Sequence, residues 1–265
     1  MDFYWIYEVS GVWIFILIAG GFTLFGIVGL RLARKLFHKS LGYDGPRNDQ
    51  VTSFMSVLVL FYGITIGLVA VGTWENLSQV EEKVAREAAS LAALYRDISS
   101  FPEPDRAELK RLLKKYTRYT IDVAWPLQQK GIQPKDGVAI LNEFQDVLYG
   151  TKPSDKKDEI LLGETLRMYN DFVTLRRMRL MSVNGGLPGI IWMVIIVGAL
   201  LTISFLWFFV MEQFWLQNLM TVLVSIFIGT MIFLIAIMDH PFRGKLSVDA
   251  QPFEMVYTNF IEIGE

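Results

Sequence analysis

The sequence predicts an all-α protein: a four-transmembrane-helix membrane protein with a soluble helical bundle inserted between the second and third spans. Three observations predict this fold class. The 265 residues are 52% hydrophobic and only 20% charged, which is unusual for a soluble chain. Four charge-free stretches reach the roughly 20 residues that a helix needs to cross a bilayer. Most of the charged residues lie between the second and third stretches.

The four predicted spans cover residues 11–30, 51–74, 187–211 and 214–238. Only Glu212 and Gln213 separate the third span from the fourth, which predicts a tight hairpin at the membrane surface. Aromatic residues suit the headgroup region because their rings are amphipathic. Five tryptophans accordingly lie near the ends of spans: Trp5, Trp13, Trp74, Trp207 and Trp215.

The segment between the second and third spans has the apolar periodicity of amphipathic helices. From residue 78 to 98, apolar residues recur at steps of three and four, so a helix is expected to continue out of the second span. Pro102 and Pro104 end it, and the next helix is expected to stop at Trp125-Pro126. A shorter helix ending near Gly150 and a last one over about 159–183 complete four helices, which bury their apolar sides best as a bundle.

We therefore divide the chain into four parts. Residues 1–74 hold membrane helices 1 and 2, residues 75–186 a soluble helical domain, residues 187–238 membrane helices 3 and 4, and residues 239–265 a C-terminal tail. The expected location is the inner (cytoplasmic) membrane of a bacterium, with the lipid bilayer as the principal partner.

Basic residues near the spans give two conflicting indications of membrane orientation. Arg31, Arg34, Lys35 and Lys39 follow the first span and no Lys or Arg precedes it, which favours an outside amino terminus and places residues 75–186 outside. Other basic residues indicate the opposite: Lys83, Arg86, Arg176, Arg177, Arg179, Arg243 and Lys245. The whole-chain count does not decide, and we expect the orientation that the first span favours.

The sequence carries no signature of an enzyme. There is no G-x-S-x-G, H-E-x-x-H, P-loop or dinucleotide-binding glycine motif, and the chain has no cysteine. Its two histidines are interpreted as a headgroup-facing residue, His38, and part of a helix-ending turn, His240. Lys+Arg 25 nearly balances Asp+Glu 27, so no basic field attracts nucleic acid. We expect no catalysis, no cofactor, no metal and no nucleic-acid partner.

The second span contains a stripe of small residues at helical spacing: Ser56, Gly63, Gly67 and Ala70. Such a stripe serves either close helix packing, for which G-x-x-x-G is a known pattern, or a pore-facing surface. None of the spans carries an ionisable residue in its core, unlike proton relays and ion-coupled transporters. We interpret the stripe as a candidate pore lining.

The stripe ends at three residues of different character, which are a bulky aromatic, a carboxylate and an amide. Trp74 closes the small face, and Glu75 and Asn76 follow at the membrane surface. Glu75 is either a solvated carboxylate at a helix end or, in a symmetric ring of subunits, part of a ring of charges at a pore mouth. The candidate site is therefore the stripe with Trp74 as its last lining residue and Glu75 and Asn76 at the mouth.

Several short groups of residues form a recognisable pattern: Trp74-Glu75-Asn76, Arg86-Glu87-Ala88, Leu91, Leu94-Tyr95-Arg96, Tyr119, Trp125-Pro126, Asp239-His240-Pro241-Phe242-Arg243-Gly244 and Gln251-Pro252-Phe253. Through this pattern the chain resembles the bestrophin-like domain family over nearly its whole length. The group from Asp239 to Gly244 is interpreted as a structural turn made by Asp239, Pro241, Phe242, Arg243 and Gly244, similar to the Pro-Phe-Gly turn after the last membrane helix of bestrophins. In calcium-gated bestrophins an acidic cluster follows; here only Asp249 does, too few carboxylates for a calcium site.

This resemblance implies a function and an assembly. Bestrophins are pentameric anion channels, so it implies a homo-oligomer, five subunits, inorganic ions as partners and anion selectivity. It also implies that both termini and the central domain lie in the cytoplasm, contrary to the charges after the first span. The leading hypothesis is an oligomeric ion channel with the second span lining the pore. The alternative is a non-conducting membrane sensor or scaffold whose helical domain binds a ligand or partner.

Overall fold

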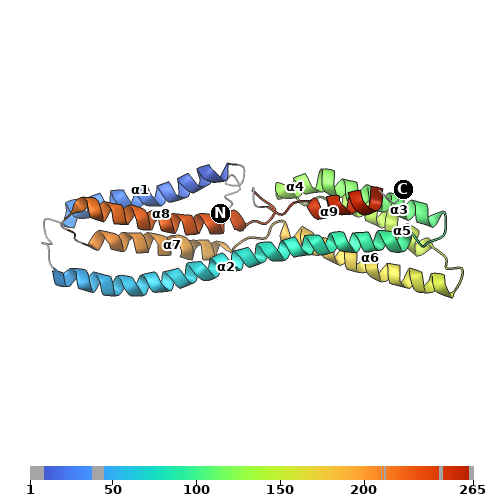
Figure 1. The fold of residues 1–265 in the computed structure, drawn as a ribbon, viewed down its shortest axis with the longest axis horizontal. Helices are drawn as coiled ribbons and strands as arrows, with labels where there is room; N and C mark the ends of the chain where they lie inside the picture. The colour runs from blue at the N-terminus through green and yellow to red at the C-terminus, as the bar shows by residue number, and fades with distance from the viewer. Residues whose placement is uncertain (1–8, 38–44, 210, 212, 245–246, 263–265) are drawn as a thin grey trace. The chain divides into compact units, whose positions relative to one another are not determined.

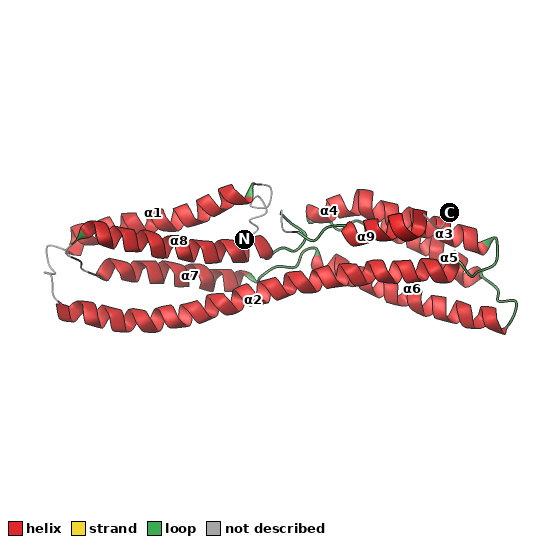
Figure 2. Ribbon diagram, in the orientation of Figure 1, coloured by secondary structure: helices red, strands yellow, loops and turns green. Residues whose placement is uncertain are grey.

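The computed structural model describes residues 9–37, 45–209, 211, 213–244 and 247–262. Figure 2 shows only helices and loops over these residues. Four helices are long and apolar enough to cross a membrane: α1 (Gly11–Phe37), α2 (Gly45–Ile98), α7 (Gly189–Phe205) with the short η3 (Leu206–Phe208), and α8 (Phe214–Met238). The prediction of an all-α fold with four membrane-length helices is therefore confirmed.

The chain divides into two compact units. The first unit comprises residues 1–75 and 186–239, and the second comprises residues 76–185 and 240–265. Helix α2 contributes to both, because it runs without a break through 54 residues. The residues after α8 thus belong to the same unit as residues 76–185.

Close backbone approaches hold α1 against α8 in the first unit, where Figure 1 shows the two helices running together. A Cβ on Gly229 would lie 2.6 Å from the Cα of Ala19, and one on Gly26 would lie 2.8 Å from the Oγ of Ser225. Neither distance leaves room for a methyl group. Small residues at these points let two membrane helices pack backbone to backbone.

Aromatic rings make the other close contacts of this unit. The indole of Trp207 covers Gly29 and donates a hydrogen bond from Nε1 to the carbonyl of Gly26 at 3.1 Å. Tyr62 of α2 lies against Gly198 of α7, and its hydroxyl donates to the carbonyl of Ile195 at 3.2 Å. These rings attach η3 to α1 and α2 to α7.

Arg34 and Gln217 organise the connection between α7 and α8. The Nη2 atom of Arg34 donates to the carbonyl of Met211 at 3.1 Å and to Oε1 of Gln217 at 2.9 Å. Gln217 donates in turn to the carbonyl of Phe209 at 2.6 Å. The carbonyls at this helix end therefore receive side-chain donors, as helix ends in an apolar environment require.

The third span is shorter than the sequence predicted. It was expected to reach Met211, but α7 ends at Phe205, η3 follows, and Phe209 is extended. Reversing the chain into α8 requires this extended stretch. The fourth span has the predicted bounds. Five residues interpreted from the sequence lie outside the described residues: Trp5, His38, Lys39, Glu212 of the hairpin and Lys245.

The second unit is built around the part of α2 that follows residue 76. The apolar stripe that includes Val80, Val84 and Leu91 is buried against other helices. Its partners are α3 (Asp105–Tyr119), α5 (Gly137–Gly150) and α6 (Lys156–Ser182), all of which contribute buried residues to the same cluster.

The predicted helix end at Trp125-Pro126 is wrong. After α3 the chain forms a π-helical turn, η2 (Thr120–Ala124), in which the N–H of Trp125 donates to the carbonyl of Thr120. Helix α4 (Trp125–Gln129) follows directly. Pro126 lies in the first turn of α4, where its missing N–H does not interrupt the helix.

The segment after α8 packs within the second unit. The rings of Phe242 and Phe253 lie 5.7 and 5.8 Å from the ring of Trp125, and the indole of Trp125 donates to the carbonyl of Val248 at 3.3 Å. Helix α9 (Gln251–Val256) and the π-helical η4 (Tyr257–Glu262) end the described chain. The hydroxyl of Tyr95 donates to the carbonyl of Ile261 at 3.4 Å, so this segment also contacts α2.

Candidate functional site

The membrane part of α2 presents three faces around its axis. One packs on α7 through Tyr62 and Ile66. At about 100° per residue, the second face carries the small-residue stripe with Trp74. The third is turned away from α7 and carries large exposed apolar residues: Val57, Leu60, Ile64, Leu68 and Val71. The stripe lies between a packed face and a broad apolar face.

Glycines distinguish the stripe from the contacts inside the chain. A Cβ added to Gly63 or Gly67 would meet nothing within 4 Å. By contrast, a Cβ on Gly198 or Gly229 would collide with a neighbouring helix. The packing function of small residues is thus fulfilled elsewhere in the first unit. Nothing in the described chain covers the glycines of the stripe.

Ser56, Ala70 and Trp74 follow the same side of α2 as the two glycines, whereas Glu75 and Asn76 lie about 100° and 200° further round the helix. Ser56 is exposed and its hydroxyl donates back to the carbonyl of Thr52 at 2.7 Å, whereas Ala70 is half-buried beside the α2–α7 contact. The side chain of Trp74 is 62% exposed, and Glu75 and Asn76 are exposed. The structure therefore places six of the seven predicted residues on accessible surface and Ala70 at its edge.

Asp239, the first residue of the predicted turn, ties the start of α7 to the end of α8. Its Oδ1 accepts from the backbone N–H of Leu187 at 2.5 Å, and its Oδ2 accepts from Nε1 of Trp192 at 3.1 Å. One carboxylate thus receives two donors from the beginning of the third span. This is a structural role at the boundary of the first unit.

The rest of the turn belongs to the second unit. The N–H of Arg243 donates to the carbonyl of His240 at 2.9 Å, and the carbonyl of Pro241 accepts from Val248 at 2.8 Å. Gly244 has φ +84°, a conformation that favours glycine. Phe242 is fully buried against Trp125.

The Arg243 guanidinium lies over Gly131, whose φ is +74°. The positive φ favours glycine at this position, and a Cβ there would fall 1.6 Å from Nη2 of Arg243 and displace the guanidinium.

A buried ion pair, absent from the sequence prediction, lies in the second unit. Arg179 of α6 donates from Nε to Oε2 of Glu87 at 2.6 Å and from Nη2 to Oε1 of Glu87 at 3.1 Å. Its Nη1 donates to Oε1 of Gln128 at 2.6 Å. The hydroxyl of Tyr116 lies 3.4 Å from Oε1 of Glu87. Glu87 is 0% exposed and Arg179 is 1% exposed, so this pair is removed from water.

Aromatic rings and charge define the environment of the pair. The guanidinium carbon of Arg179 lies 5.4 Å from the ring centre of Trp125 and 5.5 Å from that of Phe253. Burial alone would lower the pKa of Arg179, but its interactions with Glu87 and Tyr116 together outweigh burial and hold this pKa above its usual value. Burial raises the pKa of the Tyr116 hydroxyl, and the Glu87 charge raises it further. The Arg179 guanidinium is therefore charged at neutral pH.

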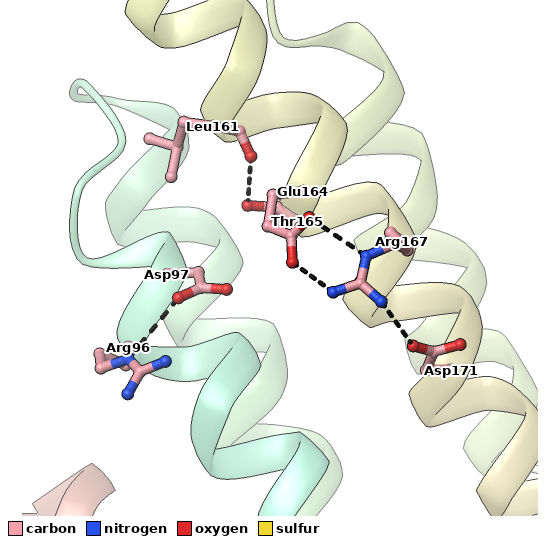
Figure 3. Close-up of polar contacts among 7 residues, drawn as sticks. All are labelled: Arg96, Asp97, Leu161, Glu164, Thr165, Arg167 and Asp171. Carbon is pink, nitrogen blue, oxygen red and sulfur yellow. Dashed lines mark hydrogen bonds and ion pairs between the residues drawn. The ribbon is translucent and has the colours of Figure 1, made fainter.

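Other ion pairs of the second unit are exposed. Figure 3 shows Arg167 of α6 between Glu164 and Asp171, and Arg96 of α2 beside Asp97. Such solvated pairs contribute little to stability. Within the described ranges, no group of three or more His, Asp or Glu side chains is placed to hold a metal ion. The stripe on α2 and the buried pair remain as the two features with functional potential.

A family model and solved structures match this chain. A model of the bestrophin-like domain matches residues 20–253. No curated protein sequence matches the chain. A structure of a bacterial bestrophin homologue from Klebsiella pneumoniae carrying one substitution superposes with a TM-score of 0.72 at 12% identity, covering 94% of this chain and 99% of that chain. Another structure of this homologue gives a TM-score of 0.70 at 12% identity, with 93% and 98% covered. At this identity the likeness shows a shared fold.

Proposed function

Because this chain belongs to the bestrophin-like family, we propose that it forms a homo-oligomeric ion channel in which α2 lines the pore. The observation that carries the proposal is the uncovered stripe of α2. Gly63 and Gly67 have no neighbour within 4 Å of an added Cβ, whereas Gly26, Gly29, Gly198 and Gly229 of the other membrane helices make close contacts inside the chain. Small side chains on a surface leave room for an ion and its water.

One α2 helix cannot enclose a water path, so the proposal requires several copies. A closed ring with cyclic symmetry would direct the same face of every α2 toward the axis. With the stripe toward that axis, the large apolar residues Leu60, Ile64 and Leu68 face lipid or a neighbouring subunit, where apolar surface is favoured. We propose five subunits, as the family resemblance implies.

Trp74, Glu75 and Asn76 would then form the mouth of the pore. Trp74 is the bulkiest residue on the stripe face, and a ring of such side chains can close an apolar pore by excluding water. The family resemblance favours anions, whereas a ring of Glu75 carboxylates repels them. We propose that anions pass and that Glu75 limits their passage.

Two measurements test this function. Native mass spectrometry of the detergent-solubilised protein should give one closed oligomer, and the same oligomer in planar bilayers should conduct ions. A monomer at every concentration would remove the pore hypothesis, because the stripe would then face lipid alone.

The sensor alternative needs a ligand site in the second unit. A cavity lined by Phe101, Thr151, Lys152 and Leu161 among others has a volume of about 10 Å³, which holds roughly one water molecule. It does not support ligand binding. If oligomers are silent across voltage, pH and salt while the protein binds a small molecule, the sensor replaces the channel.

A further inference from the structure

A group of exposed apolar side chains lies at one end of the second unit. Residues 130–138 lie against the last turns of α6, because Nε2 of Gln133 donates to the carbonyl of Leu180 at 3.0 Å. A Cβ on Gly137 would likewise lie 3.4 Å from Nη2 of Arg176. Neighbouring large apolar side chains on a surface indicate a partner that covers them. The exposed apolar residues of these two segments, which we call the Met181 patch, are Ile132, Val138, Met178 and Met181.

Basic side chains accompany the Met181 patch. Lys130 and Lys135 are exposed in the segment that carries Ile132, and Arg177 is exposed on the last turns of α6. None of these three cations forms an ion pair with a carboxylate in the described part of the chain. Asp136 is the one carboxylate within residues 130–138 and 176–181. The surface is therefore positively charged as well as apolar, a combination that suits a membrane with anionic headgroups.

The Met181 patch lies at the end of the second unit from which the chain passes to the third span and to which it returns from the fourth. Residues 182–188 alone separate Met181 from α7. Residues 239–242 separate Arg243 from α8, and the Arg243 guanidinium lies over Gly131, the neighbour of Ile132. A stretch of five residues reaches at most about 17 Å. The chain therefore holds this end of the second unit within reach of the lipid headgroups at the ends of two membrane helices.

We propose that the Met181 patch is a lipid-binding surface, with its apolar side chains in the headgroup region and Lys130, Lys135 and Arg177 on the phosphates of anionic phospholipids. The exposed apolar residues favour a lipid over a free phosphate ion. The three cations disfavour a second copy of the same patch, because two identical patches in contact would bring like charges together. The inference does not depend on the proposed channel, and its test requires no conductance.

The first test measures what covers Met181. The cysteine-free chain accepts one environment-sensitive fluorophore at Met181→Cys, in vesicles of phosphatidylcholine and phosphatidylglycerol. Lipids that carry a nitroxide near the headgroup should quench this label by at least about twofold, and iodide in the water should quench it weakly. Ile160→Cys is the matched control, because Ile160 is also exposed and lies about 31 Å from Met181 along α6. Its label should respond to iodide and not to the nitroxide lipids.

The second test measures the selection of anionic lipid. The label at Met181→Cys should be quenched more by nitroxide phosphatidylglycerol than by nitroxide phosphatidylcholine. Adding Lys130→Gln, Lys135→Gln and Arg177→Gln should reduce this preference at least about fivefold, since each cation near the surface attracts anionic lipid. High salt should reduce it in the parent as well. The control removes three exposed lysines at the other end of α6 and should leave the preference unchanged: Lys152→Gln, Lys156→Gln and Lys157→Gln.

The possible outcomes distinguish lipid from water and from protein. If iodide quenches the label at Met181→Cys as strongly as the label at Ile160→Cys, the patch faces water and the inference is overturned. Protection of the label at position 181 from both quenchers would show that a second protein surface covers the patch, which also overturns it. Equal preference for phosphatidylglycerol in the parent and in the folded variant without the three cations would overturn the assignment of anionic lipid.

Discussion

The ring of Tyr62 lies directly over Gly198, with its Cδ2 atom 2.4 Å from the point that a Cβ on Gly198 would occupy. The hydroxyl of the same tyrosine is held by the carbonyl of Ile195. One side chain of α2 is thus fixed at both its ring and its hydroxyl by a single turn of α7. Together with the buried Ile66, this contact attaches the membrane part of α2 to α7 within the first unit.

Enlarging Gly198 should therefore detach α2 from α7. Gly198→Leu forces the Tyr62 ring out of its place, and we expect a loss of about 1–3 kcal/mol in the free energy of unfolding, as in other overpacked cores. The melting temperature in detergent measures the effect. Gly20→Leu is the matched control, because a Cβ there has no neighbour within 4 Å. Equal melting temperatures for the two variants would contradict the packing described.

The effects of Arg34 and Gln217 on the free energy of unfolding should be coupled. Arg34→Ala and Gln217→Ala each leave carbonyl groups of the α7–α8 connection without a side-chain donor, at a cost of about 1–3 kcal/mol. The double variant should lose less than the sum of the two single losses. Arg31→Ala, which removes an exposed cation from the same helix, is the control. Additive losses would show that the two residues act independently.

Trp74 should control the opening of the pore. Trp74→Ala removes the bulky ring at the end of the stripe and should raise the open probability in planar bilayers, because a wider apolar ring stays wet more of the time. Trp215→Ala, which also removes an exposed tryptophan of the first unit, should leave it unchanged. An unchanged open probability in Trp74→Ala would place the constriction elsewhere.

Glu75 should control which ions pass. Glu75→Gln removes a ring of negative charge at the mouth, and the reversal potential under a salt gradient should move toward anion permeability. The shift should shrink as ionic strength rises, because salt screens exposed charges. Glu82→Gln, on an exposed part of the same helix, should leave the reversal potential as it is. A pore indifferent to Glu75→Gln would be lined by another segment.

Membrane orientation is testable at Lys156. Its side chain is 79% exposed at the start of α6, and the chain has no cysteine, so Lys156→Cys gives one reactive thiol. The charges after the first span predict labelling of intact cells by an impermeant reagent. Labelling only after the cells are broken would favour the cytoplasmic placement that the bestrophin resemblance implies. Arg34 is a weaker indicator of orientation than its charge implies, because its hydrogen bonds to Met211 and Gln217 give a structural reason for an arginine at this position.

The membrane helices could be predicted from the sequence because their signal is local. Few structures other than a membrane-spanning helix suit a charge-free run of this length. The predicted bounds of α8 match the structure. The end of α7 was harder to place, because Leu206 to Met211 is as apolar as the helix before it. Only the hydrogen bonds from Gln217 and Arg34 show where the chain must leave the helix.

The buried pair could not be predicted because its partners are far apart in the sequence. Glu87 and Arg179 are separated by 92 residues, and each lies among other charged residues that are exposed. One signal was present: Glu87 occupies a position at helical spacing within the stripe of Val84 and Leu91, where an apolar residue is expected. The prediction of a helix end at Pro126 was wrong for a different reason, because the π-helical turn before α4 places the proline in the first turn of that helix.

The unbroken course of α2 has a consequence for the thickness of the surrounding bilayer. Its 54 residues span about 81 Å, far more than the roughly 30 Å of a hydrocarbon core. A helix that ends at the membrane surface can adjust to a thicker or thinner bilayer by tilting or fraying its last turn. Helix α2 continues beyond the span, so it cannot respond by fraying at that surface, and a mismatch there must be met by tilting or by local thickening or thinning of the bilayer.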